Sequence, residues 1–150
     1  MKKKITKQQV LDICIQKQEE QVENFDSRVN SMKLDINNKD YSASQSEDRQ
    51  AGKTELLRIY ERELTFSTND LNTLQSIDPT VEYSTVQPGA LVTTDQLLFF
   101  IAISTEKFEI GGATVIGISA RAPIYQAMLG LAKGDSFKFN DMDYLIEALY

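Results

Sequence analysis

The sequence predicts an α+β protein in which a long antiparallel helical hairpin is followed by a small mixed domain. Three observations carry this prediction. Two apolar stripes, each with alternating spacings of four and three residues, run through the first half of the chain. A polar segment at 37–53 separates them, and short segments rich in β-branched and aromatic residues follow Pro79. We therefore expect residues 1–78 to form an antiparallel coiled coil with a polar tip near 37–53, and residues 79–150 to form an α+β domain.

The first stripe predicts a helix from about Thr6 to Ile36. Thr6 and Gln9 have the spacing of a capping box, and Asn37 and Asn38 favour a turn after the helix. Thirty residues at 1.5 Å each give a helix of roughly 45 Å, which is long for a chain of this size. The stripe is apolar at every position but one: Leu11, Ile15, Gln18, Val22, Phe25, Val29, Met32 and Ile36.

The second stripe predicts a partner helix that ends after Asp78, before Pro79. It also has one polar interruption: Leu57, Tyr60, Leu64, Ser67, Leu71 and Leu74. A turn centred near Gln45 places Met32 opposite Leu57, whereas a turn centred near Tyr41 places Met32 opposite the polar Gln50. The first register is favoured. The second helix then begins near Gln45, with Gly52 inside it and the segment 37–53 partly irregular.

The composition excludes several classes of function. A net charge of −6 argues against binding nucleic acid mainly through phosphate neutralisation. The chain has no histidine, which removes the usual general base and zinc ligand, and its single Cys14 is expected to pack beside the first stripe. The basic cluster of Lys2, Lys3, Lys4 and Lys7 is expected to be a solvated N-terminal tail. With no signal peptide and no membrane span apparent, we expect a cytoplasmic protein.

Carboxylates are the candidate chemical groups at the polar tip. The segment and its flanks carry Asp35, Asp40, Glu47, Asp48 and Glu55. One interpretation is that Asp40, Glu47 or Asp48 supplements a metal site in a partner protein, because two or three carboxylates do not make a complete metal site alone. The alternative is that Glu47 and Asp48 only favour a helix N-terminus while the others are solvated.

The C-terminal half predicts strands at 91–93, 97–104, 113–119, 136–139 and 143–149, with Glu109, Gly111 and Gly112 marking the turn before the third. A short helix is expected at 122–131, with proline in its first turn and Gly130 near its end. The sequence Lys133-Gly134-Asp135 supplies a turn, and the last two strands meet around Asn140 and Asp141. A small sheet with one covering helix follows.

The helix and turn of this half resemble a known family. The run from Ala122 to Gly130 (APIYQAMLG), followed by Lys133 to Phe137 (KGDSF), resembles the C-terminal domain of the bacterial Gre transcript-cleavage factors. That family also places a strand just before this helix and a long antiparallel coiled coil before the domain, so the resemblance covers nearly the whole chain. It implies that 79–150 has the general fold of FKBP-type domains. It also implies a partner-binding region at Pro123, Ile124, Tyr125, Gly134 and Asp135.

The resemblance further implies an accessory factor, which is not itself an enzyme, of bacterial RNA polymerase. Such factors insert the coiled-coil tip into the secondary channel of the polymerase and help it cleave backtracked RNA. Their acidic pair helps to hold Mg²⁺ in the polymerase active site, so the chain needs no cofactor of its own and contacts the RNA 3′ end only indirectly. By this resemblance Glu47 and Asp48 are the candidate metal ligands, with Asp40 as a third candidate catalytic carboxylate. We expect a monomer.

One departure from the family bears on cleavage. Typical members carry an aspartate-leucine-x-glutamate-asparagine run at the tip, and 37–53 contains no aspartate-x-x-glutamate pair followed by asparagine. Adjacent Glu47 and Asp48 point about 100° apart on a helix and share one side only in a loop. Three alternatives therefore stay open: a non-cleaving Gre-like regulator, a coiled-coil protein unrelated to transcription whose hairpin dimerises, and a prolyl isomerase. The last class commonly has a tryptophan at the floor of its pocket, and this chain has no Trp.

Overall fold

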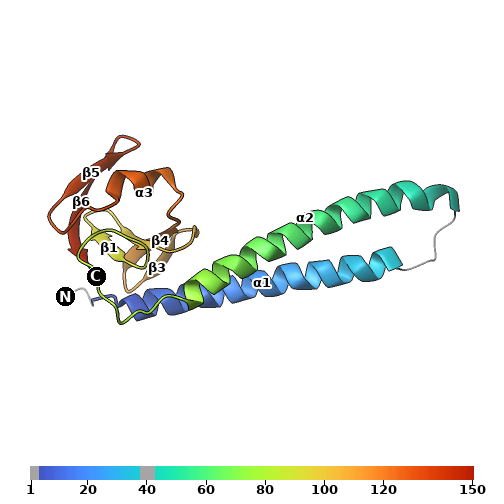
Figure 1. Ribbon diagram of the computed structural model, residues 1–150, viewed down its shortest axis with the longest axis horizontal. Coiled ribbons are helices and arrows are strands. Elements are labelled where there is room, and N and C mark those ends of the chain that lie inside the picture. The colour runs from blue at the N-terminus through green and yellow to red at the C-terminus, as the bar shows by residue number, and fades with distance from the viewer. Residues whose placement is uncertain (1–3, 38–42) are drawn as a thin grey trace. The chain divides into compact units, whose positions relative to one another are not determined.

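The computed structural model describes residues 4–37 and 43–150 and confirms the α+β class. Two long helices, α1 (Lys7–Asn37) and α2 (Ala43–Gln75), precede a six-stranded sheet with one short helix (Figure 1). The chain divides into two compact units. One is Gln16–Asn72, and the other combines Met1–Ile15 with Thr73–Tyr150. The first turns of α1 and the last residues of α2 therefore belong to the unit that contains the sheet.

The start of α1 is fixed by the predicted capping box. The backbone N–H of Thr6 donates to Gln9 Oε1 at 3.0 Å, and the backbone N–H of Gln9 donates to Thr6 Oγ1 at 3.1 Å. Both side chains thus satisfy amide groups that the first helical turn leaves without partners. The predicted boundaries of this helix are confirmed to within a residue.

The seam between α1 and α2 uses the residues of the two stripes. Within Gln16–Asn72, Val29, Gln18 and Ser67 are buried, and the other stripe positions of the described residues are half-buried. Asp35 pairs with Lys53, and Gln21 donates to Ser67. In each pair the two residues are equally far along the chain from position 44. The helices therefore run antiparallel, in the register that the apolar pairing favoured.

The second helix begins at Ala43, which agrees with the predicted start near Gln45 to within two residues, and Gly52 lies inside the helix as expected. Residues 43–53, the described part of the segment expected to be partly irregular, are helical. The helix ends at Gln75, three residues earlier than predicted. There, Ser76 N–H bonds to the carbonyl of Thr73 and Ile77 N–H to that of Leu74, a tighter i→i−3 pattern that closes the helix.

The sheet has six strands, in the order β3-β4-β2-β1-β6-β5. Neighbours are antiparallel except β2 and β4, which are parallel. The strands are β1 (Leu91–Thr94), β2 (Leu98–Ile101), β3 (Phe108–Ile110), β4 (Ala113–Ile118), β5 (Ser136–Phe139) and β6 (Met142–Leu149). The prediction missed β3: Glu109 lies inside it, and only Gly111 and Gly112 form the turn. The strand expected at 97–104 stops at Ile101 because the chain then leaves β2 to reach the edge of the sheet.

Each face of the sheet carries its own core. One face packs against the base of the hairpin, where Val10, Leu11, Cys14 and Leu74 are buried, which confirms the packing role of Cys14. The other face packs against α3 (Pro123–Met128), through Tyr125 and Met128. Helix α3 is shorter than the predicted 122–131, because Leu129 leaves helical geometry and Gly130 adopts φ 78°.

Lys7 contradicts the prediction of a solvated basic tail. Its side chain is only 3% exposed and belongs to the first turn of α1. Nζ donates to the carbonyl oxygens of Val81 (2.6 Å) and Gly89 (3.1 Å), and it lies 4.6 Å from the centroid of the Tyr83 ring. Lys7 therefore ties the segment between α2 and β1 to the start of α1, whereas Lys4 is exposed as predicted.

Candidate functional site

The part of the hairpin nearest its turn is held by ion pairs across and along the helices. Lys33 Nζ lies 3.9 Å from Glu61 of α2, and Lys53 Nζ lies 3.7 Å from Asp35 of α1. Glu55 pairs with Arg58 one turn further along α2, at 3.8 Å. These side chains are largely exposed apart from Lys53, so each pair contributes little to stability, about 0–1 kcal/mol.

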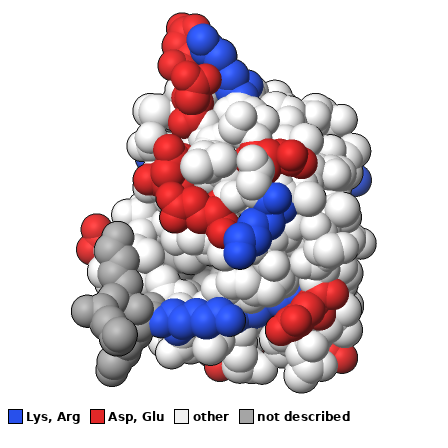
Figure 2. Space-filling model, turned by 90° about the vertical axis from the view of Figure 1, so that its left-hand side faces the viewer, with Lys and Arg blue, Asp and Glu red and all other residues white. Residues whose placement is uncertain are grey.

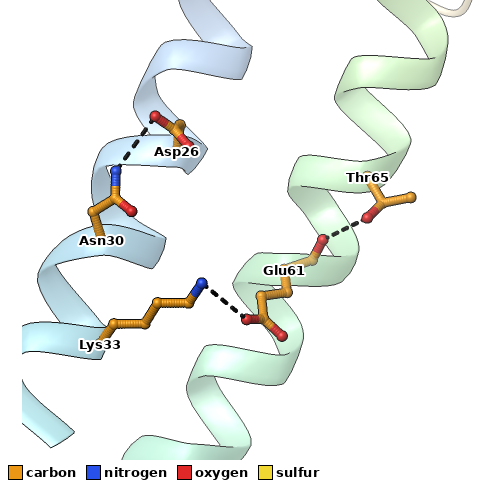
Figure 3. A network of polar contacts seen from close by, with 5 residues as sticks. All are labelled: Asp26, Asn30, Lys33, Glu61 and Thr65. Carbon is orange, nitrogen blue, oxygen red and sulfur yellow. Dashed lines mark hydrogen bonds and ion pairs between the residues drawn. The ribbon is translucent and has the colours of Figure 1, made fainter. Parts of the chain in front are cut away.

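Figure 3 shows how these contacts alternate with bonds inside each helix. Asn30 donates to Asp26 at 3.4 Å within α1, and the Thr65 hydroxyl donates to the Glu61 carbonyl at 2.9 Å within α2. The carboxylate of Glu61 meanwhile faces Lys33 of the other helix. The exposed flank of the hairpin is therefore a mixed-charge surface and not a uniformly acidic one.

The structure describes the predicted tip carboxylates only in part. Asp40 lies outside the described residues. Glu47 and Asp48 are positions of α2, but their side chains lie outside the described part of the chain. Consecutive positions on a helix are separated by about 100° around its axis. The loop geometry that would let Glu47 and Asp48 share one side is therefore not the backbone geometry of these positions.

The carboxylates that are described beside the turn have cationic partners. Asp35 is matched with Lys53, and Glu55 with Arg58. Among the side chains that the structure describes, no group of three or more Asp, Glu or Cys residues could hold a metal ion. The described carboxylates at this end of the hairpin are thus each engaged by a cation.

The second candidate region is α3 with the turn that follows it. Pro123 is exposed at the start of the helix, Ile124 is half-buried, and Tyr125 is 4% exposed and part of the core beneath. Tyr125 therefore shapes this surface from below. The exposed part consists of Arg121, Pro123, Gln126, Leu129 and Lys133, which we call the α3 surface.

Gly134 and Asp135 form a rigid turn beside the α3 surface. Asp135 Oδ2 accepts the N–H of Ala132 at 2.8 Å, and Gly134 has φ 93°, which favours glycine. The N–H groups of Gly134 and Ile146 complete the turn by bonding to the carbonyls of Ile146 and Asp135, both at 2.9 Å. The glycine and the aspartate of the motif thus hold the start of β5 in place, and only their exposed edges are open to a partner.

Two solved structures align with most of this chain. The transcription factor Gfh1 aligns over 91% of this chain and 92% of its own, at 14% identity and a TM-score of 0.35. GreA factor homolog 1 (Gfh1) of Thermus thermophilus aligns over 91% and 94%, at 12% identity and a TM-score of 0.34. Gfh1 is a Gre factor homologue. At these identities and TM-scores, the superposition assigns no role to any residue of this chain.

Sequence comparisons do not assign the chain to a family. No protein-family model matches the chain, and no curated protein matches it. Within the described residues, neither long helix has a stretch apolar enough to cross a bilayer.

Besides strand β3, sequence reasoning missed two features of the domain. One is the burial of Lys7, whose only signal was its place one residue after the capping threonine. The other is a pocket that opens beside the ends of four strands and whose lining residues are distant in sequence.

Proposed function

We propose that this chain is a Gre-type accessory factor of bacterial RNA polymerase. One observation carries the proposal. The motif that resembles the Gre C-terminal domain folds as helix α3, a glycine-aspartate turn and strand β5, and this domain follows a hairpin of two antiparallel helices. The resemblance of the sequence and the order of the elements thus support the same family. In this proposal the domain binds the rim of the secondary channel while the hairpin enters it.

The chemistry expected of such a factor fits the residues of this chain. Without histidine, the chain lacks the usual general base. A carboxylate at position 40, 47 or 48 would instead supplement the ligands of Mg²⁺ held by the polymerase, and would help to orient the water that attacks the RNA backbone. The protein would then act as an accessory to the polymerase's reaction.

A second candidate function is a Gre-like regulator that occupies the channel without stimulating cleavage. The placement of Glu47 and Asp48 at consecutive positions of α2 favours it, because these positions are separated by about 100° around the helix axis. A factor of this kind would alter initiation or pausing by filling the channel.

Both candidates are tested with stalled elongation complexes of the host's own polymerase. We expect the full chain to co-elute with the complexes, and RNA shortening to depend on a tip carboxylate. Glu47→Ala, Asp48→Ala and Asp40→Ala are compared with Glu19→Ala, an exposed residue of α1 outside the tip. Loss of cleavage with retained co-elution in a tip variant supports the first function. Co-elution without cleavage by the unmodified chain supports the second.

The α3 surface supplies the test of polymerase binding itself. Pro123→Ala and Leu129→Ser change exposed side chains, and Leu129 is 51% exposed. We expect each to weaken co-elution by about 1–2 kcal/mol, or fivefold to thirtyfold, if this surface meets the polymerase. Absence of co-elution by the unmodified chain, together with a dimeric mass by light scattering, would instead support the hairpin-dimer alternative.

A further inference from the structure

A pocket of about 530 Å³ opens on the domain, within the unit formed by Met1–Ile15 and Thr73–Tyr150. It lies where β1 and β6 end and where β2 and β4 begin. Its volume falls in the range of sites that hold small molecules or single side chains of a partner. The function proposed above does not use this pocket.

The lining of the pocket combines apolar side chains with polar ones such as Thr93, Gln96 and Thr114. Leu98, Ala113 and Ala148 are among the apolar ones, and Gly111 and Gly112 form the tight turn at one side. Leu98 belongs to the core cluster that packs against the start of α1, and Ala113 packs against that cluster. The pocket is therefore the part of this sheet face that α1 leaves uncovered, and it lies across the sheet from α3.

The rim carries two carboxylates and one ammonium group. Asp95 and Glu147 line the pocket, both are exposed, and neither takes part in an ion pair among the described residues. The ammonium of Lys4 lies 5.0 Å from the centroid of the Tyr150 ring. Figure 2 shows one face of the molecule, on which Asp and Glu side chains gather with Lys and Arg side chains beside them.

Asp95 is fixed at the rim. Its Oδ1 accepts the N–H of Leu145 at 2.9 Å, and its own N–H donates to the Leu145 carbonyl at 3.1 Å. The other carboxylate oxygen, Oδ2, makes no hydrogen bond within the described residues. A held carboxylate with a free oxygen loses little conformational entropy when it accepts a cation.

We propose that this pocket receives an arginine side chain of a partner protein. The planar guanidinium has weakly hydrated faces that can lie against Leu98, Ala113 and Ala148, and its fork of N–H donors suits carboxylates and the hydroxyls of the mixed lining. Asp95 and Glu147 supply two negative charges against the single positive charge of Lys4, so the rim is complementary to a cation on balance. Because the α3 surface lies on the other side of the sheet, an arginine bound here would be a contact separate from that surface.

The test is a titration of the ¹⁵N-labelled full chain, followed by NMR, with Nα-acetyl-L-arginine methylamide. We expect saturable shifts centred on the amides of Gly111 and Gly112. The citrulline analogue, which has the same shape without the charge, should bind at least about tenfold more weakly. Glu147→Gln should weaken arginine binding about fivefold to tenfold. Asp143→Asn removes the same charge from an exposed residue of β6 outside the pocket lining, and should leave binding unchanged.

Three outcomes would overturn the proposal. Equal binding of the citrulline analogue would remove the role of charge. Equal weakening by Glu147→Gln and Asp143→Asn would show a general effect of net charge and not of the pocket. Tighter binding of free L-arginine than of the blocked derivative would identify a small-molecule site, because a residue inside a protein chain has neither the free amine nor the free carboxylate.

Discussion

Gln18 and Ser67 meet in the seam between α1 and α2, where the side-chain amide of Gln18 donates to the Ser67 carbonyl oxygen at 2.9 Å. They are the single polar interruptions of the two apolar stripes, and they are 6% and 2% exposed. Gln21 adds a second bond, to Ser67 Oγ at 3.2 Å. The buried amide of Gln18 is therefore satisfied by the backbone of Ser67, and the hydroxyl of Ser67 is satisfied by Gln21, so both polar interruptions find partners in this register of the hairpin.

Two replacements of Gln18 test its effect on stability and its effect on the helix register separately. Gln18→Ala should lower the free energy of unfolding by about 1–3 kcal/mol, because it removes a buried hydrogen bond and leaves a gap in the seam. Gln18→Leu should keep or raise stability while it weakens register specificity, since the stripe becomes apolar throughout. Circular dichroism during thermal unfolding, with light scattering for the oligomeric state, measures both. A Leu variant less stable than the Ala variant would contradict this account.

Lys7 supports the segment before β1, and its removal should be costly. Lys7→Met leaves the carbonyls of Val81 and Gly89 without their donor, and should lower the free energy of unfolding by about 2–4 kcal/mol. Lys4→Met changes an exposed lysine and is the matched control, with an expected change within about 0.5 kcal/mol. Urea denaturation of both variants measures the difference. Equal stability of the two variants would show that the buried contacts of Lys7 contribute nothing.

The burial of Lys7 also predicts that the free energy of unfolding depends on pH. Burial, opposed in part by the charges of Glu82 and Asp78, lowers the pKa of Lys7 from its ordinary value of 10.5. Between the lowered pKa and 10.5 the unfolded chain binds more protons than the folded chain, so the contribution of this group to stability rises with pH across that window. The difference in unfolding free energy between the unmodified chain and Lys7→Met should therefore be larger near the upper end of that window than at neutral pH. A difference that shrinks as pH rises would reverse the sign of this linkage.

Gly117 and Gly52 should respond in opposite directions to alanine. A Cβ at Gly117 would lie 2.5 Å from the Ile103 carbonyl oxygen and under 3 Å from the Thr105 side chain, where the chain crosses β4. Gly117→Ala should cost about 2–4 kcal/mol. Gly52 has nothing within 4 Å, so Gly52→Ala should raise the helical signal and stabilise α2 by about 0.5–1 kcal/mol. Thermal unfolding followed at 222 nm compares them, and similar effects of both changes would contradict the predicted crowding.

The capping box offers a local test. Thr6→Ala removes the acceptor for the Gln9 N–H, and should lower stability by about 1 kcal/mol, whereas Thr6→Ser should retain most of it. Chemical denaturation of the two variants distinguishes loss of the hydroxyl from loss of the methyl group. Equal destabilisation by alanine and serine would show that the methyl group, and not the cap, matters.

Local patterns in the sequence were sufficient for the features that depend on near neighbours. Spacings of three and four residues predicted α1, α2 and their register, because side chains at those spacings share one face of a helix. Thr6 and Gln9 predicted the start of α1, and Asn140 and Asp141, both with positive φ, the turn between β5 and β6. The order of the C-terminal elements followed from β-branched runs and glycine turns.

The remaining features were decided by tertiary structure. Strand β3 is three residues long and carries no recognisable pattern, and it exists because Phe108–Ile110 pairs with β4 at the edge of the sheet. Lys7 looks like part of a basic tail in the sequence, but the carbonyls that bury it are more than seventy residues away. The pocket likewise joins Asp95 to Glu147 through the pairing of β1 and β6. A sequence reports which neighbours a residue has along the chain, whereas burial and charge pairing depend on the residues that folding brings beside it.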